Sequence, residues 1–231
     1  MKTLGLIGGM SWESTADYYS LLNRTTRERL GGSHSAPLIL WSVDFEPIVH
    51  MQAEDRWDEA ARILVEVARR LEGAGAEALM ICANTMHRMA DDVAAAVKVP
   101  LIHIADSTAA AVKATSVRRP LLLGTRYTME QGFYRDRLAA LGVEAVIPGE
   151  VDRARIQRMI YEELVRGIIN PQSRAALLQI VGAERAAGAD GVILGCTELG
   201  MLVGEGDIRV PTFNSLELHA RAGLEFALGS G

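Results

Sequence analysis

Positively charged residues are not in excess in this sequence, which has 24 lysines and arginines against 29 aspartates and glutamates. The formal net charge is −5, so the chain lacks the basic field that holds a phosphate backbone, and we expect no nucleic-acid partner. Long apolar runs are missing as well, because no window approaches the roughly 20 apolar residues of a membrane span. The first ten residues reach a glycine turn without the cleavage site of a secretory leader. These absences predict a cytoplasmic protein with no membrane partner.

Cysteine is scarce, with Cys82 and Cys196 alone among 231 residues. Two cysteines cannot build a disulfide framework, and neither lies in a Cys-x-x-Cys or His-x-x-x-His context that would bind a structural zinc ion. Motifs for phosphate binding are also lacking. No Gly-x-Gly-x-x-Gly follows the first apolar run, and Gly-x-x-x-x-Gly-Lys-Ser/Thr does not occur. We therefore expect neither a metal nor a nucleotide cofactor.

The sequence does contain a repeated alternation of short aliphatic runs, turns rich in Gly, Ser, Thr and Asn, and longer amphipathic stretches. This alternation is typical of βαβ units and therefore of an α/β fold with parallel sheets. The chain is long enough for one large domain or two small ones. The expected strands are 4–7, 38–43, 78–82, 120–123 and 190–194, and the clearest helices are 12–30 and 59–73.

Three landmarks recur in the same order in the two halves of the chain. Surface loops tolerate insertions better than strands do, so a drift of a few residues in their spacing fits a tandem duplication. Alternatively, strands that end in glycine coincide by chance in any α/β protein. We expect two similar domains, 1–105 plus 212–231 and 106–211. The landmarks are Gly8, Ala83 and Pro100 in the first half and Gly124, Cys196 and Pro211 in the second, at offsets of 116, 113 and 111 residues.

Four polar turns follow expected strands, at 8–11, 83–85, 124–125 and 195–197. In parallel sheets, ligands bind beyond the carboxyl ends of the strands, where such turns lie. Backbone amides, hydroxyls and the N-termini of the following helices suit a small carboxylate. If the two halves face each other, all four turns surround one cleft.

Cys196 directly follows an expected strand and precedes Thr197 and Glu198, which opens the next helix. Because a helix N-terminus lowers the pKa of a thiol, we expect Cys196 to exchange protons near neutral pH from a pocket that solvent reaches. A small buried hydrophobe at a strand end is the alternative. Cys82 closes an apolar run, and strand alternation turns it away from the side of Ala83, so we expect it in the core.

Two histidines lie near the turn of the first half. His87 falls one turn into the helix after Asn84 and Thr85, where its ring either faces the cleft or covers the helix. His103 lies in an apolar strand, which is typical of a hydrogen-bonded core residue. We expect His87 to tune neighbouring groups and neither histidine to be catalytic.

Six segments resemble the aspartate/glutamate racemase family, in family order and across nearly the whole chain. The resemblance implies two flavodoxin-like domains related by a pseudo-twofold axis, a site at the interdomain cleft, and a homodimer. It also implies racemisation of aspartate or glutamate, a small carboxylate substrate, without pyridoxal phosphate or metal. The segments are Gly-Leu-Ile-Gly-Gly-Met-Ser-Trp-Glu-Ser-Thr (5–15), Ser-Val-Asp-Phe (42–45), Asn-Thr-Met-His (84–87), Gly-Thr-Arg-Tyr-Thr-Met (124–129), Tyr-Glu-Glu-Leu (161–164) and Gly-Cys-Thr-Glu-Leu (195–199).

The resemblance also implies roles for individual residues. In the family, one cysteine of each domain flanks the substrate α-carbon, one removing the proton as a thiolate and the other delivering a proton to the opposite face. The cysteine of the second domain corresponds to Cys196. Contacts to the substrate carboxylate fall on Asn84, Thr85, Thr125 and Thr197, and the pocket is lined by Met10, Ser11 and Gln52.

The chain departs from the family pattern in three places. The family's Cys-Asn-Thr is Cys82-Ala83-Asn84-Thr85 here, so Ala83, which cannot hold a proton, occupies the slot of the first cysteine. The family's Ile-Pro-Asp-Arg arginine, which binds the side-chain carboxylate, is missing from the corresponding region. Its lysine in the second half corresponds to Arg166, and an arginine places the positive charge differently.

Three functions fit a site with one thiol. The first is a racemase whose second acid/base is Cys82, reaching in through a bulge, or a water beside Ala83. The second is an enzyme like arylmalonate decarboxylase, in which loss of carbon dioxide creates the carbanion and Cys196 protonates it on one face. The third is a carboxylate-binding protein without turnover. The motifs at 84–87 and 124–125 favour the first.

Overall fold

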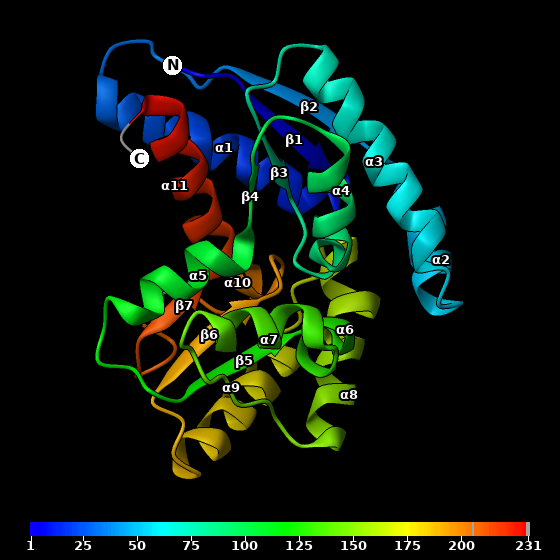
Figure 1. Cartoon of the computed structure of the whole chain (residues 1–231). Coiled ribbons are helices and arrows are strands. Elements are labelled where there is room, and N and C mark those ends of the chain that lie inside the picture. The colour runs from blue at the N-terminus through cyan, green and yellow to red at the C-terminus, as the bar shows by residue number, and fades with distance from the viewer. Residues whose placement is uncertain (205, 230–231) are drawn as a thin grey trace. The chain divides into compact units, whose positions relative to one another are not determined.

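The chain divides into two units in the computed structural model, which describes residues 1–204 and 206–229. Unit 1 is Met1–His103 with His219–Gly231, and unit 2 is Ile104–Leu218. Each unit is an α/β fold with its own parallel sheet (Figure 1). The predicted α/β class with two parallel sheets is thereby confirmed. Among the described residues, no helix is both long and apolar enough to cross a bilayer.

The sheet of unit 1 has four parallel strands in the order β2-β1-β3-β4. Its two central strands are buried along their whole length, as expected for strands covered by helices on both faces. The strands are β1 Leu4–Gly8, β2 Leu38–Ser42, β3 Ala78–Ile81 and β4 Leu101–Ile102. The helices are α1 Trp12–Leu30, α2 Phe45–Ala53, α3 Trp57–Gly73, the 3₁₀ helix η1 Thr85–Met89, α4 Ala90–Ala96 and most of α11 Ser215–Leu228.

Local sequence signals fix the turn between β1 and α1, and the helix has the predicted bounds. Gly9 has a φ of 90°, and a Cβ there would lie 2.2 Å from the carbonyl oxygen of Val43, so the turn requires glycine. Ser11 caps the helix by accepting the N–H of Ser14 at 3.3 Å. The hydroxyl of Thr15 donates to the Ser11 carbonyl at 2.7 Å and accepts the Gly9 N–H at 2.8 Å. The turn is therefore held rigidly at the carboxyl end of the sheet.

The sheet of unit 2 has three parallel strands in the order β5-β6-β7. Successive residues of β5 face opposite sides, so Leu121 and Leu123 pack in one apolar cluster and Leu122 in another. The strands are β5 Pro120–Gly124, β6 Gly191–Gly195 and β7 Thr212–Asn214. The helices are α5 Ile104–Lys113, α6 Arg126–Glu130, α7 Gly132–Ala140, α8 Glu150–Arg158, the π-helix η2 Met159–Glu163, the 3₁₀ helix η3 Leu164–Arg166, α9 Pro171–Ala186 and α10 Leu199–Leu202.

The expected domain boundary at residue 212 falls at the first residue of β7. This strand pairs with β6 and so belongs to the sheet of unit 2. The chain passes to unit 1 later, within α11, and leaves unit 1 at His103 rather than at residue 105. The expected and observed domain boundaries differ because β7 is short, and the sequence pattern alone does not show which sheet this strand joins.

The two sheets share one strand order. Val146 forms an isolated parallel bridge with Leu121 of β5, so it stands beside β5 as β2 stands beside β1. The order β2-β1-β3-β4 in unit 1 is therefore matched by Val146-β5-β6-β7 in unit 2. This common topology supports the tandem duplication that the sequence landmarks indicate.

Strand register aligns the two halves residue by residue. Ile81 of β3 pairs with β1 one residue before β1 ends, and Leu194 of β6 pairs with β5 one residue before β5 ends. Two residues further along the chain stand Ala83 in unit 1 and Cys196 in unit 2. Ala83 therefore occupies, within its own sheet, the position that Cys196 occupies in the other.

Candidate functional site

The Cys196 thiol lies directly beyond β6, at the carboxyl end of the sheet of unit 2. The strand ends in a glycine because a Cβ on Gly195 would lie 2.7 Å from the Leu122 side chain. Cys196 Sγ donates a hydrogen bond to Glu198 Oε2 at 3.0 Å, and the Thr197 hydroxyl donates to the same oxygen at 2.8 Å. A thiol and a carboxylate therefore share one hydrogen-bonded cluster.

The pKa of Cys196 is raised well above its ordinary value of 9.0. Burial is the largest cause, because Cys196 is 5% exposed and packs in the apolar cluster of unit 2, and the charge of Glu198 adds to it. Hydrogen bonds from the backbone of Glu198 and Leu199 lower the pKa by less. The expected lowered pKa and open thiol are thus wrong for this structure. The following helix, α10, has only four residues, and its weak dipole is outweighed by burial and the carboxylate.

Tyr161 of η2 interacts electrostatically with Cys196 and Glu198. Its pKa is raised by burial first and then by the charges of Tyr127, Cys196 and Glu198. Tyr161 therefore stays protonated at neutral pH, when its hydroxyl can donate a hydrogen bond. We call Tyr161, Cys196, Thr197 and Glu198 the thiol cluster. Sequence reasoning assigned no role to Tyr161 and treated Glu198 only as the start of a helix, although its spacing of two residues from Cys196 was a signal.

Of two further predicted site residues in unit 2, Thr125 is buried and Arg166 is exposed. Thr125 follows β5, which neighbours β6, and its buried hydroxyl caps α6 by accepting the Thr128 N–H at 3.2 Å. Arg166 is exposed at the end of η3, and η3 contacts α10, the helix that follows the thiol cluster. Thr125 is thus held by a hydrogen bond at the end of the sheet, whereas the Arg166 side chain is exposed at the surface.

Unit 1 gathers its predicted residues at the carboxyl ends of β1 and β3, which are neighbours in the sheet. Gln52 of α2 reaches the turn after β3, where its Nε2 donates to the sulfur of Met86 at 3.2 Å. The strand ends in the sequence predicted the grouping of the turns at 8–11 and 83–85, whereas Gln52 was implied by the family resemblance. The predicted residues of unit 1 are all buried: Met10, Ser11, Gln52, Cys82, Ala83, Asn84 and Thr85.

Cys82 is fully buried, as strand alternation predicted. Its N–H donates to the carbonyl of Ile7 at 2.9 Å, which continues the β1–β3 ladder past the end of β3 without a bulge. Burial raises the pKa of the Cys82 thiol. Cys82 is therefore poorly suited to exchange a proton with a substrate.

Three buried histidines, which we call the histidine cluster, lie behind the turn that holds Ala83. The Nδ1–H of His87 donates to the Ala83 carbonyl at 2.8 Å, and the His87 ring centre is 4.6 Å from that of His103 and 5.5 Å from that of His219. His103 is buried, as expected. Sequence reasoning missed His219, because it meets the cluster from α11 at the far end of the chain.

Hydrogen bonds determine the tautomer of His219. Its Nε2 lies 2.8 Å from the Ile102 carbonyl, which can only accept, so Nε2 carries the hydrogen. In the neutral ring, Nδ1 then accepts the hydroxyl hydrogen of Tyr18 at 2.8 Å. These contacts tie α1, β4 and α11 together and make His219 a structural residue.

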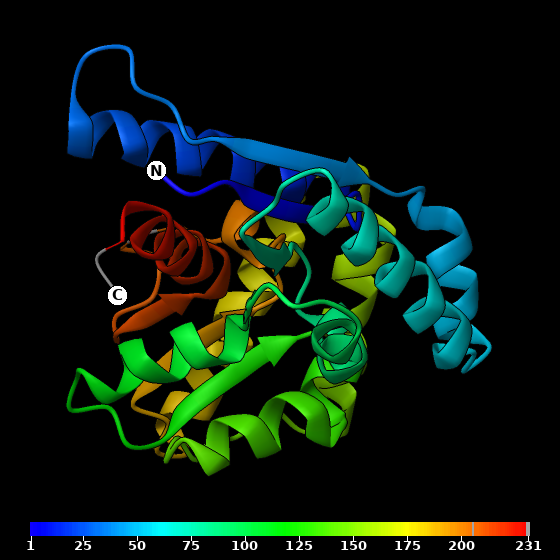
Figure 2. The ribbon, with the colours of Figure 1, turned by 45° about the horizontal axis from the view of Figure 1, so that its top comes forward.

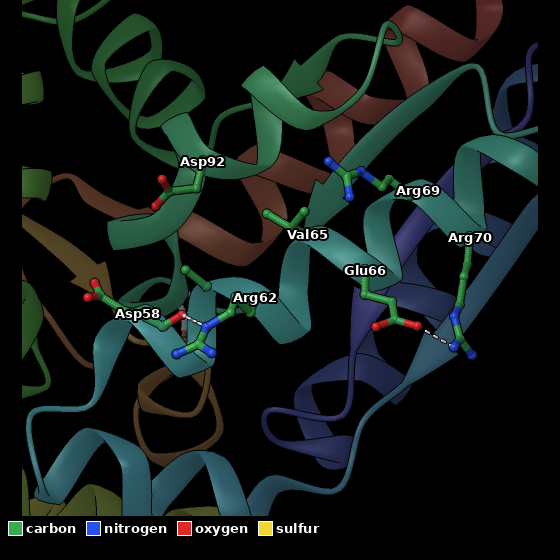
Figure 3. Close-up of a pocket in the computed structure, with 8 residues that line it drawn as sticks. Asp58, Arg62, Val65, Glu66, Arg69, Arg70 and Asp92 are labelled. Carbon is green, nitrogen blue, oxygen red and sulfur yellow. Dashed lines mark hydrogen bonds and ion pairs between the residues drawn. The ribbon is translucent and has the colours of Figure 1, made fainter.

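No three or more His, Cys, Asp or Glu side chains in residues 1–204 and 206–229 are grouped so that they could hold a metal ion. A separate groove of about 830 Å³ lies between α3 and α4 (Figure 3). Its lining is mainly charged and includes Arg62, Glu66, Arg69 and Asp92. None of the predicted site residues lines this groove, so its size alone does not make it the catalytic site.

These features define a duplicated parallel α/β protein with a thiol at one strand end. Residues 7–223 match the family described as Asp/Glu/hydantoin racemase. The chain belongs to this family, and it is therefore an amino-acid racemase, an isomerase.

Known proteins are similar over almost the entire chain. The crystal structure of a candidate Asp/Glu racemase from Yersinia pestis is 49% identical, with a TM-score of 0.91 over 99% of this chain and 100% of that one. An aspartate racemase homologue from Pyrococcus horikoshii OT3 is 37% identical, with a TM-score of 0.85 and the same coverage. The broad specificity amino-acid racemase RacX of Bacillus subtilis (strain 168) is 23% identical over 223 residues, which is 92% of each chain.

Proposed function

We propose that the protein racemises aspartate or glutamate with Cys196 as the acid/base thiol, without pyridoxal phosphate or a metal. The observation that carries the proposal is the 3.0 Å hydrogen bond from Cys196 Sγ to Glu198 Oε2. The substrate class is supported by the descriptions of similar proteins, which include an aspartate racemase homologue. A thiol is a suitable acid/base because it is easily deprotonated once a neighbouring base accepts its proton.

Glu198 is the group that can accept the thiol proton. Its transfer from Cys196 gives a thiolate and a neutral carboxylic acid, so the net charge of the buried cluster does not change. The thiolate then removes the α-proton of the substrate. An S–H bond forms as the C–H bond breaks, and the electron pair remains on the α-carbon, stabilised by donors around the substrate carboxylate.

Return of a proton to the opposite face requires a second donor. Ala83 has no ionisable group, and Cys82 is fully buried with a raised pKa. We assign this step to a water molecule, which protonates the carbanion and becomes hydroxide. The hydroxide regains a proton from solvent while Glu198 releases one, which closes the cycle. Because loss of a positioned general acid/base typically costs about 10²- to 10⁴-fold, we expect slow racemisation with a bias in direction.

The polar turns provide donors for the substrate carboxylates. Asn84, Thr85, Thr125 and Thr197 are all buried at the carboxyl ends of strands, where hydroxyl and amide groups can bind the α-carboxylate. Arg166 is the candidate for the side-chain carboxylate, since its guanidinium forms two parallel hydrogen bonds with such a group.

Deuterium exchange tests the proposal. The protein is incubated with L-aspartate or L-glutamate in D₂O, and the α-proton is followed by NMR together with the chirality of the product. Exchange with inversion supports racemisation. Exchange with retention supports a one-sided site, and an absence of exchange at protein concentrations well above trace contradicts the proposal.

Ala83 also favours a second candidate, a decarboxylase of disubstituted malonates in which Cys196 protonates one face of the carbanion. This reaction needs no second acid/base, because loss of carbon dioxide creates the carbanion. A panel of arylmalonates supplied to the same protein separates the candidates, since carbon dioxide release with no exchange of amino acids would replace racemisation. Binding of carboxylates without either reaction would identify a protein that has lost turnover.

A further inference from the structure

A surface cavity of about 500 Å³ lies in unit 1, between the last turns of α1 and the segment that follows this helix. Arg24 and Arg27 line it from α1, and residues 32–35 line it from the segment. Figure 2 shows the segment arching beyond the end of α1 before it enters β2. We call this cavity the arginine pocket. Its volume is within the range of small-molecule sites, so it can hold more than a single ion.

Hydrogen bonds hold the segment in place. Gly31 ends α1 with a φ of 76°, and its N–H donates to the Arg27 carbonyl at 2.8 Å. The N–H of His34 donates to the Gly31 carbonyl at 3.3 Å, which closes the turn. The N–H of Ala36 donates to Asn23 Oδ1 at 3.0 Å and so fastens the segment to α1. The walls of the arginine pocket are therefore formed without a ligand, which lowers the cost of ordering them on binding.

The arginine pocket has a positively charged lining. Arg24 and Arg27 are three residues apart on α1, so their side chains project from one face of the helix. In residues 1–204 and 206–229, neither guanidinium forms an ion pair, whereas Arg29 in the last turn pairs with Glu225. No aspartate or glutamate is among the described residues that line the pocket. In a chain with a net charge of −5, this local excess of positive charge attracts an anion.

Hydroxyl groups complement the two guanidiniums. Ser20 of α1 and Ser33 and Ser35 of the segment line the arginine pocket. A carboxylate has two oxygens and one charge, which a single guanidinium satisfies with two parallel hydrogen bonds. A phosphate monoester has three terminal oxygens and close to two charges at neutral pH. Two guanidiniums and three hydroxyls therefore match a phosphate monoester better than a carboxylate.

An aromatic side chain stands at one end of the arginine pocket. Tyr19 lines the pocket and is 56% exposed. It precedes Arg24 by five residues, which is about 8 Å along the helix axis. This separation is comparable with the span from the phosphate to the base in a nucleoside monophosphate. An exposed tyrosine ring can stack against a base, because every base has a flat aromatic face.

The arginine pocket is distant from the predicted site residues at the start of α1. Ser11 caps the helix, and Arg27 follows it by sixteen residues, which is about 24 Å along the axis. A ligand of the pocket would thus occupy a site apart from these residues. Phosphate-binding motifs describe loops that lead from a strand into a helix. The arginine pocket lies where a helix leads toward a strand, which is why those motifs did not reveal it.

We propose that the arginine pocket binds a nucleoside monophosphate, with the phosphate between Arg24 and Arg27 and the base stacked on Tyr19. Electrostatics favour the phosphate even at the end of α1, because the helix dipole contributes about half a negative charge there against two full guanidinium charges. The negative net charge of the chain disfavours longer nucleic acids, which approach over a larger surface. Binding at this pocket does not depend on the proposed racemase mechanism.

Isothermal titration calorimetry with adenosine monophosphate tests the proposal. We expect the wild type to bind one molecule per chain, and the double variant Arg24→Gln/Arg27→Gln to bind at least about tenfold more weakly, because two charge-assisted contacts are lost. Arg62→Gln/Arg69→Gln is the matched control, since it removes two exposed arginines of α3 and should bind like the wild type. No binding by the wild type at millimolar concentrations, or an equal loss in both variants, overturns the proposal.

Further titrations identify which part of the ligand is recognised. Inorganic phosphate should bind the wild type more weakly than adenosine monophosphate does, because it lacks the base. Tyr19→Ala should weaken the binding of adenosine monophosphate and leave that of inorganic phosphate unchanged. Equal affinity of the wild type for the two ligands contradicts the role of Tyr19. L-Aspartate should not displace adenosine monophosphate, since displacement would place the nucleotide in a carboxylate site and overturn the proposal.

Discussion

Cys196 Sγ and Glu198 Oε2 lie 3.0 Å apart, which joins a thiol and a carboxylate in one hydrogen bond within unit 2. Burial of the sulfur raises the pKa of the thiol most and the Glu198 carboxylate raises it further, so the resting cysteine is protonated. The same carboxylate accepts the hydrogen bond of the thiol and is therefore placed to take its proton. In the proposed mechanism, Glu198 stabilises the protonated thiol and also allows its conversion to a thiolate without a change of net charge.

Replacing Glu198 with glutamine separates these two effects. Glu198→Gln keeps the volume and removes the charge, so the pKa of Cys196 should fall toward 9.0 while burial keeps it above that value. The rate of α-proton exchange should nevertheless fall about 10²-fold, because the thiol proton has lost its acceptor. Ultraviolet absorbance of the thiolate against pH measures the first effect. Glu217→Gln, at an exposed position of α11, is the control, and an unchanged titration midpoint in Glu198→Gln would disprove the coupling.

Substitution of Ala83 tests whether position 83, the unit 1 equivalent of Cys196, lies next to the substrate. Ala83→Cys introduces a thiol at the register position equivalent to Cys196, so exchange with inversion should rise by about 10²-fold or more. Ala90→Cys, another buried alanine turned into cysteine, should leave the rate unchanged. The same rate in both variants would show that position 83 does not reach the substrate.

The fold was largely predictable because its signals are local. Gly9 and Ser11 mark the turn and the cap of α1 in the sequence itself, and the glycines that end β1 and β5 mark equivalent strands. The register of Ala83 against Cys196 followed from these landmarks. The boundary near residue 212 was misplaced because β7 has three residues and no pattern that shows which sheet it joins.

The place of Cys196 at a strand end was predictable from the sequence, but the direction of its pKa shift was not. The sequence placed Cys196 at a strand end, yet its burial depends on residues of the apolar cluster, such as Leu164 and Ile160, that precede it by more than thirty positions. The bond between Tyr18 and His219 joins residues 201 positions apart, so no local pattern could reveal it. A pKa depends on such packing, which is why the helix-terminus argument alone gave the wrong direction.

The stability of the protein should decrease at alkaline pH because of Cys82. Burial raises its pKa above the ordinary 9.0, so the folded chain holds the thiol proton more tightly than the unfolded chain does. This contribution is fully present below about pH 9 and is lost as the pH rises above it, by about 1.4 kcal/mol for each further unit. Urea denaturation at several pH values should show a smaller alkaline loss for Cys82→Ala. If the free energy of unfolding fell equally with pH in the wild type and in Cys82→Ala, the predicted contribution of Cys82 would be contradicted.

Gly9 should tolerate a side chain poorly because its Cβ would meet the backbone. A Cβ there would lie 2.2 Å from the Val43 carbonyl oxygen, whereas Gly75, which also has a positive φ, has nothing within 4 Å. Both Gly9→Ala and Gly75→Ala incur the cost of a left-handed conformation, about 1–2 kcal/mol. Chemical denaturation should show a further loss of about 1–3 kcal/mol for Gly9→Ala alone. Equal losses would mean that the turn relaxes without cost.

The matched pair Cys196→Ser and Cys82→Ala tests the central claim most directly, because each variant removes one of the two thiols. Deuterium incorporation at the α-carbon of L-aspartate and L-glutamate is measured for both, with folding checked by circular dichroism. We expect Cys196→Ser to lose at least about 10²-fold in exchange rate and Cys82→Ala to stay close to the wild type. Exchange at the wild-type rate in folded Cys196→Ser would contradict the account.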